Sequence, residues 1–455
     1  MTMSENKQQQ EGISVQKQAE RPSDFSSELQ KLVKFGGFNA LESSIDGIAS
    51  MNPERKARRK MFLTDPERAK ERKELIKRLE MWLNMLKEGK SISEMIDICK
   101  EKSNLVADLL KKNQMKAIEE IKPLETSYRT VMLFYKNTES DKIKNISIIN
   151  ASMEQLTDLD NSIYIDAIAN ELRAHFDRLD LRTNYSLLVL PGYLGSNMVL
   201  EKWAKIAHEN KVMIFTDFAD LDKPDDVIEL FFNSNLTGGD AYRSNVCMTC
   251  NYLIGRGKYA ELGEEEDLRI PPSAALAGSV YKTLMSQVTA GKKHGGLSEV
   301  NGVAFPLKKT EISEIEKMGL IPMVNEYGKV MAFSAKTLFN GDNLGLQTYS
   351  VVRVFDWITK VLFDFLNRRA FENWTNNTEK DLRRQIIKFL DGIQGADRLI
   401  EKFKILRFER DPKQKDRIFL DIHITPFFPA KSFVIKLDGT KGDDETEWNA
   451  DYQNA

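Results

Sequence analysis

The sequence predicts an α+β protein with mixed sheets and packed helices, an N-terminal helical lobe and extended terminal arms. Three features indicate this class. Apolar residues recur every three or four positions in the first third of the chain, which is the period of one helix face. A strand, a helix and a second strand follow one another between residues 185 and 216. Strict alternation of apolar and polar residues near position 420 is typical of a strand with one buried face.

Length and composition limit the class of protein further. At 455 residues the chain exceeds one ordinary domain, and two or three lobes are expected. The net charge of −2 gives no argument for nucleic acid as a partner. We find no window of about 18 apolar residues and no segment of signal-peptide type, so no membrane insertion is expected. Three cysteines do not suggest a disulfide framework, which favours a cytoplasmic location.

Residues 1–62 are predicted to form a flexible N-terminal arm. The first 22 residues have the polar composition of a disordered segment. A short amphipathic helix follows and ends at Gly36-Gly37. Its apolar face consists of Phe25, Leu29, Leu32 and Val33. Because an isolated helix of this length is unstable, it either docks on its own core or is presented to another protein. The basic run at 55–60 is interpreted as a solvated face, since no aromatic residues interleave it.

Residues 63–123 are predicted to form the helical lobe. Thr64-Asp65-Pro66-Glu67 has the composition of a helix start, with Thr as the cap and proline in the first turn. The apolar face of this helix consists of Leu75, Leu79, Trp82 and Leu86. A second helix is predicted from Asn104 to Ile121, and Pro123 is expected to follow its end.

Residues 124–400 are predicted to form the core domains. A first strand is indicated by Ile146, Ile148 and Ile149. Ser152 and Gln155 then have the spacing of a helix cap. Further on, a buried strand at 185–190, a helix through Trp203 and a strand at 212–215 predict a β-α-β unit.

The core is organised around the stretch from Ile270 to Trp374. Pro271-Pro272 gives it a rigid extended entry, and the small residues 273–278 allow backbones to approach closely. The stretch contains a long amphipathic helix that starts at Tyr349. Its apolar residues step by three or four: Val351, Phe355, Ile358, Leu362 and Leu366. No reactive constellation occurs here, so we interpret the stretch as a scaffold.

Another amphipathic helix is predicted from Thr378 to Ile393. Its inward face consists of Leu382, Ile386, Phe389 and Ile393. Its outward face is basic and includes Arg383, Arg384 and Lys388.

Residues 401–437 are predicted to form a C-terminal β arm. It contains strands at 403–409 and 417–424, and then a link stiffened by Pro426 and Pro429. The final strand of the arm includes Phe433, Val434, Ile435 and Leu437. Residues 438–455 carry six acids and one lysine and are predicted to be a disordered acidic tail.

No catalytic, cofactor-binding or metal-binding set is predicted. Cys247 and Cys250 have the spacing of a redox or metal-ligand pair, but Cys99 is remote, so we interpret them as buried structural thiols. The loop at 191–196 follows a strand as a phosphate loop does, yet it lacks the Gly-Lys-Ser/Thr pattern. The acidic run at 264–267 is interpreted as a solvated loop.

The order of the core motifs resembles that of contractile tail-sheath proteins. Those motifs are Pro-Pro-Ser at 271–273, Gly302-Val303, the strand after Gly319 and a Val-Arg-X-Phe helix at 352–355. The chain as a whole is most similar to the large sheath subunit of the type VI secretion system, the TssC/VipB family, in its Bacteroidetes-like form. Residues 124–129 match that family's Leu-Glu-X-X-Trp-Arg motif, with Tyr128 in place of Trp. The resemblance extends from about residue 65 to about 437.

This resemblance implies a structural subunit of the type VI contractile sheath and no enzyme. It implies pairing with a small sheath subunit of the TssB/VipA type, and further copies of the pair in a helical sheath around an Hcp tube. A baseplate and a ClpV-type AAA+ ATPase are the other implied partners, and no cofactor is implied.

Three contact sites are expected from the same resemblance. Phe25, Leu29, Leu32 and Val33 would be the handle for the ATPase. Arg383, Arg384 and Lys388 would face the inner tube. Phe433, Val434, Ile435 and Leu437 would form a strand exchanged between subunits.

One alternative stays open from the residues alone. The β-α-β unit at 185–216, with its glycine-containing loop, would also suit a cytoplasmic α/β nucleotide-binding enzyme. The missing phosphate-loop lysine and the missing acid at the dinucleotide-binding position argue against it.

Overall fold

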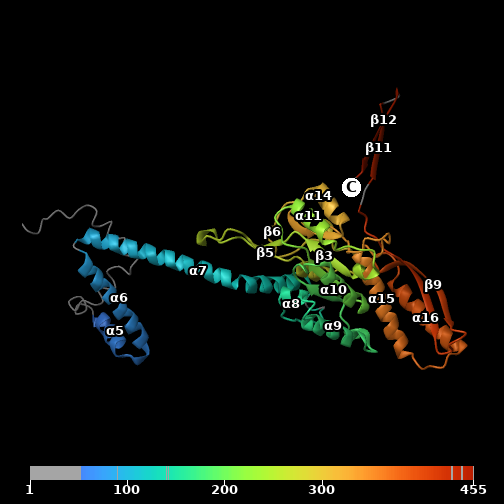
Figure 1. Cartoon of the computed structure of the whole chain (residues 1–455), viewed down its shortest axis with the longest axis horizontal. Helices are drawn as coiled ribbons and strands as arrows, with labels where there is room; N and C mark the ends of the chain where they lie inside the picture. The colour runs from blue at the N-terminus through green and yellow to red at the C-terminus, as the bar shows by residue number, and fades with distance from the viewer. Residues whose placement is uncertain are drawn as a thin grey trace, which may run out of the picture. The chain divides into compact units, whose positions relative to one another are not determined.

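The computed structural model describes residues 53–89, 91–139, 141, 143–431, 434–441 and 444–453 (Figure 1). The chain divides into two units, one that ends at Ala117 and one that begins at Ile118. Among the described helices, none has the length and hydropathy that a membrane span requires. Five residues of the predicted contact sites lie outside the described residues: Phe25, Leu29, Leu32, Val33 and Phe433.

The described part of the first unit is helical, as the sequence predicts. It contains α5 (Pro53–Thr64), the 3-10 helix η3 (Pro66–Arg68), α6 (Ala69–Glu88) and the N-terminal part of α7 (Ile92–Asn137). Met85 of α6 and Cys99 of α7 are buried, and their sulfur atoms lie 3.1 Å apart. The two helices therefore share a small apolar contact.

The corner between α5 and α6 differs from the predicted helix start. Thr64 is the last residue of α5, and Asp65 is the N-cap of η3, where it accepts a hydrogen bond from the Glu67 amide (2.9 Å). Asp caps a helix as well as Thr does. Arg72 Nη1 also donates to the carbonyls of Phe62 (2.8 Å) and Asp65 (2.5 Å), which stabilises the corner.

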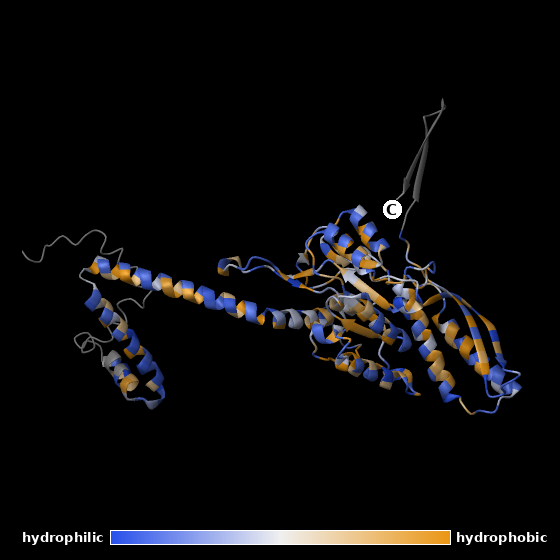
Figure 2. Ribbon diagram, in the orientation of Figure 1, coloured by the Kyte–Doolittle hydropathy of each residue, from blue (hydrophilic) through white to orange (hydrophobic). Residues whose placement is uncertain are grey.

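Helix α7 continues through Pro123, so the predicted helix end before this proline is wrong. A proline inside a helix costs about 3 kcal/mol, and tertiary contacts beyond it offset that cost. Leu133 is buried, and the Asn137 side chain donates to the Ser298 carbonyl (3.2 Å). Along α7, Figure 2 shows hydrophobic and hydrophilic residues interleaved, as in an amphipathic helix.

Residues 143–152 form no strand, so the strand predicted at Ile146, Ile148 and Ile149 is wrong. All three isoleucines are exposed, because no described strand pairs with this segment. The next prediction is confirmed. Helix α8 (Met153–Thr157) begins with a reciprocal cap, in which Ser152 Oγ accepts from the Gln155 amide and Gln155 Oε1 accepts from the Ser152 amide.

The main sheet of the second unit has the strand order β1-β2-β3-β7-β8. Its strands are β1 (Leu187–Leu190), β2 (Met213–Asp217), β3 (Val246–Cys250), β7 (Leu320–Glu326) and β8 (Lys329–Ala332). The first four are parallel, and β8 pairs antiparallel with β7. Helix α10 (Asn197–Glu209) joins β1 to β2, which confirms the predicted β-α-β unit. A mixed sheet of this kind belongs to the predicted α+β class.

Helices cover both faces of this sheet (Figure 1). One face packs against α10, α9 (Ile163–Phe176), α11 (Pro224–Ser234) and α14 (Lys309–Lys317). The other packs against α12 (Ser273–Lys282), α15 (Tyr349–Arg368) and the C-terminal part of α7. Successive residues of β2 serve the two faces, since Ile214 belongs to the first core and Phe215 to the second. Two short 3-10 helices precede strands of this sheet in the sequence: η5 (Leu181–Thr183) comes before β1, and η6 (Ala241–Asn245) comes before β3.

The small residues at the start of α12 bring two helices into close contact. A Cβ atom added at Gly278 would lie 2.4 Å from the Phe134 carbonyl oxygen and 3.2 Å from the Phe134 Cα atom of α7. Backbone atoms of α7 cannot move aside without a large cost in free energy, so only glycine fits at this position. This agrees with the sequence interpretation of residues 273–278 as a close-packing segment.

We predict that Gly278→Ala destabilises the second unit. Overpacking of this kind typically costs about 1–3 kcal/mol, and urea denaturation of the full-length chain measures it. Gly392→Ala is the matched control, because Gly392 is also helical and nothing lies within 4 Å of its added Cβ atom. The control is expected to be neutral or slightly stabilising. Equal effects of the two substitutions would contradict the close-contact explanation.

A second, smaller sheet is formed by three strands that lie between β3 and β7 in the sequence. Its central strand β4 (Leu253–Arg256) pairs antiparallel with β5 (Leu268–Ile270) and β6 (Gly302–Val303). The 3-10 helix η7 (Ala260–Leu262) lies between β4 and β5. Helix α13 (Gly291–His294) precedes β6.

The C-terminal predictions of a helix and two strands are confirmed. Helix α16 (Asn376–Ile393) buries Leu382, Ile386 and Leu390, and β9 (Ile400–Arg410) pairs antiparallel with β10 (Ile418–Pro426). The four isoleucine and leucine residues of β10 at alternate positions pack against the core formed by α15, α16 and β9. The predicted boundary at residue 401 therefore falls inside a packed region, and residues 400–426 are not an arm.

The last described residues form a hairpin. Strand β11 (Val434–Lys441) pairs antiparallel with β12 (Asp444–Gln453), with Val434 opposite Gln453. The prediction of a disordered tail at 438–455 is wrong over these two strands. Acidic residues disfavour strands when counted by composition, but Thr446, Trp448 and Tyr452 are good strand formers at alternate positions.

Candidate functional site

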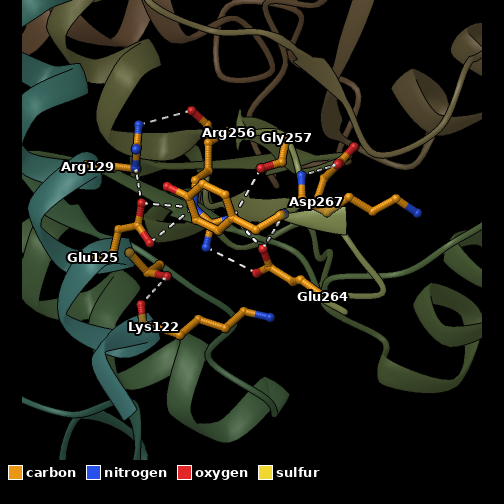
Figure 3. A network of polar contacts seen from close by, with 11 residues as sticks. Lys122, Glu125, Arg129, Arg256, Gly257, Glu264 and Asp267 are labelled. Atoms are coloured by element: carbon orange, nitrogen blue, oxygen red, sulfur yellow. Dashed lines mark hydrogen bonds and ion pairs between the residues drawn. The ribbon is translucent and has the colours of Figure 1, made fainter. Parts of the chain in front are cut away.

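The first candidate site is a cluster of charged side chains that joins α7 to the smaller sheet (Figure 3). We call it the Arg256 network; it consists of Glu125, Arg129, Arg256 and Glu264. Arg256, at the end of β4, donates from Nη1 and Nη2 to Glu264 (2.7 and 3.1 Å) and from Nε to Glu125 (3.1 Å). Glu125 of α7 also accepts from Arg129 Nε (2.8 Å). Arg129 Nη1 in turn donates to the Gly255 carbonyl (3.1 Å).

Most of the Arg256 network is shielded from water. Arg256 and Glu264 are each only 7% exposed. The Arg256 hydrogen bond holds the pKa of Glu264 below its usual value. Burial raises the pKa of Glu125, but the hydrogen bonds and charges of Arg256 and Arg129 outweigh burial, so that pKa is also lowered. Both carboxylates are therefore ionised at neutral pH and bound to arginine.

The Arg256 network gives a physical role to the motif at residues 124–129. Glu125 and Arg129 are one helical turn apart, so both reach the same face of α7. The interpretation of residues 264–267 as a solvated loop is wrong for Glu264, because it meets the buried arginine eight positions earlier in the chain. No spacing in the sequence identifies Arg256 as its partner.

A second buried cluster surrounds Asp217 at the end of β2. Its carboxylate accepts four hydrogen bonds: from the Gly192 amide (2.8 Å), the Ser273 amide (2.7 Å), Ser273 Oγ (2.6 Å) and Thr249 Oγ1. The cluster thus connects the 191–196 loop, β2, β3 and the first residue of α12. Burial raises the pKa of Asp217 to about 6 despite these hydrogen bonds. The serine of the Pro-Pro-Ser motif is explained by this contact.

The Asp217 cluster also argues against a phosphate site in the 191–196 loop. The Gly192 amide, which a phosphate would need, is bound to a carboxylate instead. A buried negative charge at that position repels an anion. The geometry therefore does not favour the nucleotide-binding alternative.

The thiols are buried and free. Cys247 and Cys250 lie on β3, inside the main sheet. Burial raises the pKa of Cys250 to about 12 and that of Cys247 further, so neither is a reactive thiolate at neutral pH. Within the described residues no group of three or more His, Cys, Asp or Glu side chains is arranged to hold a metal ion.

The structure places the predicted tube-facing residues on one surface. Arg383, Arg384 and Lys388 are all exposed on α16, opposite its buried face. Arg384 pairs with Asp381 on its own helix (2.7 Å). Of the predicted exchanged strand, Val434, Ile435 and Leu437 lie on β11. What these two sites contact stays a prediction.

Three family models match the chain in succession. They are the TssC/VipB-like N-terminal region over residues 25–114, the central domain of type VI secretion system TssC/VipB over 116–340, and the TssC/VipB-like C-terminal domain over 348–454. No curated protein matches the chain.

Solved sheath structures are also similar. The contracted helical sheath of the anti-feeding prophage is 17% identical, with a TM-score of 0.47 over 70% of this chain and 82% of that one. A baseplate structure of the same prophage is 17% identical, with a TM-score of 0.41 over 54% and 64%. The sheath tail protein of Desulfitobacterium hafniense is 14% identical, with a TM-score of 0.39 over 64% and 59%. The chain spans less than two thirds of the last two.

Proposed function

We propose that this chain pairs with a small sheath subunit of the TssB/VipA type. The premise is that the chain belongs to the TssC/VipB family of type VI secretion sheath proteins. The three family matches, which together extend over residues 25–454, carry this proposal. As a contractile sheath subunit, the chain has a mechanical role rather than an enzymatic one. Copies of the pair would stack around an Hcp tube on a baseplate, and a ClpV-type ATPase would recycle the contracted sheath. Contraction then draws on the free-energy difference between two packings of the same subunits.

The apolar surface of α7 supports a partner of this kind. Between residues 105 and 110, four large apolar side chains each keep more than half of their surface exposed: Leu105, Val106, Leu109 and Leu110. Leu105 and Leu109 are four residues apart, as are Val106 and Leu110, so the two pairs lie along one side of the helix. Soluble monomers rarely expose contiguous apolar surface of this kind. We infer that a helix of the small subunit covers this side of α7.

The C-terminal hairpin supports linkage between neighbouring subunits. Strands β11 and β12 form a two-stranded sheet and pair with no other described strand. A two-stranded hairpin alone is marginally stable in water. Each outer edge of the hairpin offers free backbone groups to another strand, and each added hydrogen bond contributes about 0.5–1.5 kcal/mol. We infer that β11, with Val434, Ile435 and Leu437, joins a sheet shared with a neighbouring subunit.

Truncation after Lys431 tests this linkage. The truncated chain keeps β10 and the ion pair between Lys431 and Glu316 (2.5 Å), so its fold should persist. We expect it to co-purify with the small subunit but to form no tubules in negative-stain micrographs of co-expressing cells. Truncation after Gln453 is the matched control and should leave tubules intact. Full-length tubules from the shorter chain would overturn the linkage, whereas failure of the control chain to pair would count against the sheath function itself.

A further inference from the structure

An open pocket of about 270 Å³ lies where η5, the start of β1, the residues before β2 and α15 meet. Charged side chains dominate its polar lining, four cationic and two acidic: Arg182, Lys211, Arg353, Lys360, Asp356 and Asp364. We call it the Arg353 pocket. Neither the Arg256 network nor the Asp217 cluster contributes a residue to it.

Arg353 is a buried cation without an ionic partner. The residue is 8% exposed, and within the described part of the chain its side chain makes one hydrogen bond, from Nη1 to the Val280 carbonyl (3.3 Å). No carboxylate among the described residues lies within ion-pair distance of it. A guanidinium carries five N–H donors, and a buried charge without a partner is costly. The remaining donors of Arg353 are therefore free to bind an acceptor from outside the chain.

The other charges of the pocket do not supply that acceptor. Asp356 pairs with Lys211 (3.8 Å) and accepts a hydrogen bond from Asn245 Nδ2 (2.8 Å). Lys360 Nζ donates to Asn184 Oδ1 (2.7 Å) and to the Tyr185 carbonyl (2.8 Å), both of them neutral groups. Asp356 is therefore the one carboxylate of the lining near Lys211 and Lys360, and Arg353 remains unmatched.

The two remaining charges of the lining, Arg182 and Asp364, are already engaged. Arg182 pairs with Asp180, and Asp364 pairs with Arg368 and accepts from the Leu181 amide (3.2 Å). The pocket thus keeps a local excess of positive charge. Burial lowers the pKa of Lys360 to about 8 and that of Arg353 to about 10, which still leaves both side chains mostly charged at pH 7.

We propose that the Arg353 pocket binds a small oxyanion, such as phosphate or a carboxylate, between Arg353 and Lys360. Guanidinium and ammonium groups bind such anions through charge-assisted hydrogen bonds. The pocket, of about 270 Å³, has room for an anion of this size beside the two cations. Anion binding in this pocket does not depend on sheath assembly, so this proposal can be tested independently of the proposed function.

Thermal unfolding of the full-length chain tests the proposal, with sodium phosphate, sodium acetate and sodium chloride titrated at matched ionic strength. We expect the melting temperature to rise with phosphate or acetate and to saturate, and to change little with chloride. A melting temperature that saturates with phosphate indicates that the pocket binds a free inorganic anion. A melting temperature that saturates with acetate alone indicates that it binds a carboxylate, such as one on a neighbouring chain. Binding to the native state alone produces such a saturable rise.

Three variants make the test specific. Arg353→Met removes the unmatched charge with little change in volume, and Lys360→Met removes the second cation; each should abolish the saturable rise. Lys380→Met, at an exposed site on α16, is the control and should keep it. The same rise in all four proteins would show a general salt effect and overturn the proposal, as would no saturable rise in the wild type. If Arg353→Met does not fold, the Lys360→Met titration decides.

Discussion

Replacing Arg256 by methionine is expected to destabilise the second unit by about 2–3 kcal/mol. Removal of one member of a buried ion pair typically costs about 3–5 kcal/mol, because the other charge stays buried without a partner. Here Glu264 would be stranded in a site where it is 7% exposed. The lower value is expected because the Glu125 side chain keeps 20% of its surface exposed and solvent screens part of its charge. Urea denaturation of the full-length chain measures the loss.

Two controls separate charge from packing in this experiment. Arg384→Met removes an arginine whose side chain is 78% exposed, so it should leave the free energy of unfolding nearly unchanged. The triple variant Glu125→Gln, Arg256→Met and Glu264→Gln removes all three charges together. It should be more stable than Arg256→Met alone, since no carboxylate is stranded. A triple variant less stable than Arg256→Met would show that packing, not charge, explains the loss.

The Arg256 network also predicts where the loss appears. Glu125 lies in α7 and Arg256 in β4, so the contact holds the helix to the smaller sheet. In Arg256→Met we therefore expect faster amide hydrogen exchange in residues 118–130 than in the main sheet, because local opening is set by local contacts. Uniformly faster exchange would contradict this role.

The elements that the sequence predicted best are those whose partners are close in the chain. The β-α-β unit at 185–216 is of this kind, because strand, helix and strand pack on one another and each shows its own period. Helix α16 and the pair β9–β10 were predicted for the same reason, since their buried faces repeat over many residues. In these elements local pattern and tertiary packing favour the same structure.

The errors occurred where distant contacts decide. Pro123 should end a helix by its chemistry, but Leu133 and Asn137 hold the next turns against the core. Ile146, Ile148 and Ile149 have strand propensity but no described strand beside them. The hydrogen-bond partners of Arg256, Glu264 and Asp217 could not be predicted either, since they lie 8 to 131 positions away in the sequence and follow no motif. The Arg353 pocket was not predicted either, because its lining comes from segments far apart in the chain, between residues 181 and 364.

Replacing Asp217 by asparagine is expected to destabilise the chain by about 1–3 kcal/mol at pH 7, through an unsatisfied backbone amide. One carboxylate oxygen accepts from the Ser273 amide, and the other accepts from the Gly192 amide. Whichever way an asparagine side chain is turned, its NH2 group faces one of these N–H donors. The hydroxyls of Ser273 and Thr249 can rotate to accept, but the backbone amides cannot. Ser273→Ala, which removes one hydroxyl donor and keeps both amides bound, should cost less.

The pH dependence of the same variant has a definite sign. Because burial raises the pKa of Asp217 to about 6, above about 3.9 for a free aspartate, the folded state holds the proton more tightly. The stabilising contribution of the protonated form is fully present below about pH 4 and is lost as the pH rises through about 6. Glu125 and Glu264 have lowered pKa values and act in the opposite direction, so the wild type must be compared with Asp217→Asn at each pH.

Between pH 7 and pH 5 the wild type is therefore expected to gain about 1.4 kcal/mol relative to Asp217→Asn, which is one pKa unit of differential proton binding. Urea denaturation at both pH values measures this difference, and Ser273→Ala serves as the control that keeps the titrating carboxylate. The control should follow the wild-type pH profile because its aspartate still binds the proton. If the wild type and Asp217→Asn change in parallel between the two pH values, the four hydrogen bonds outweigh burial, and the carboxylate is ionised across the whole range.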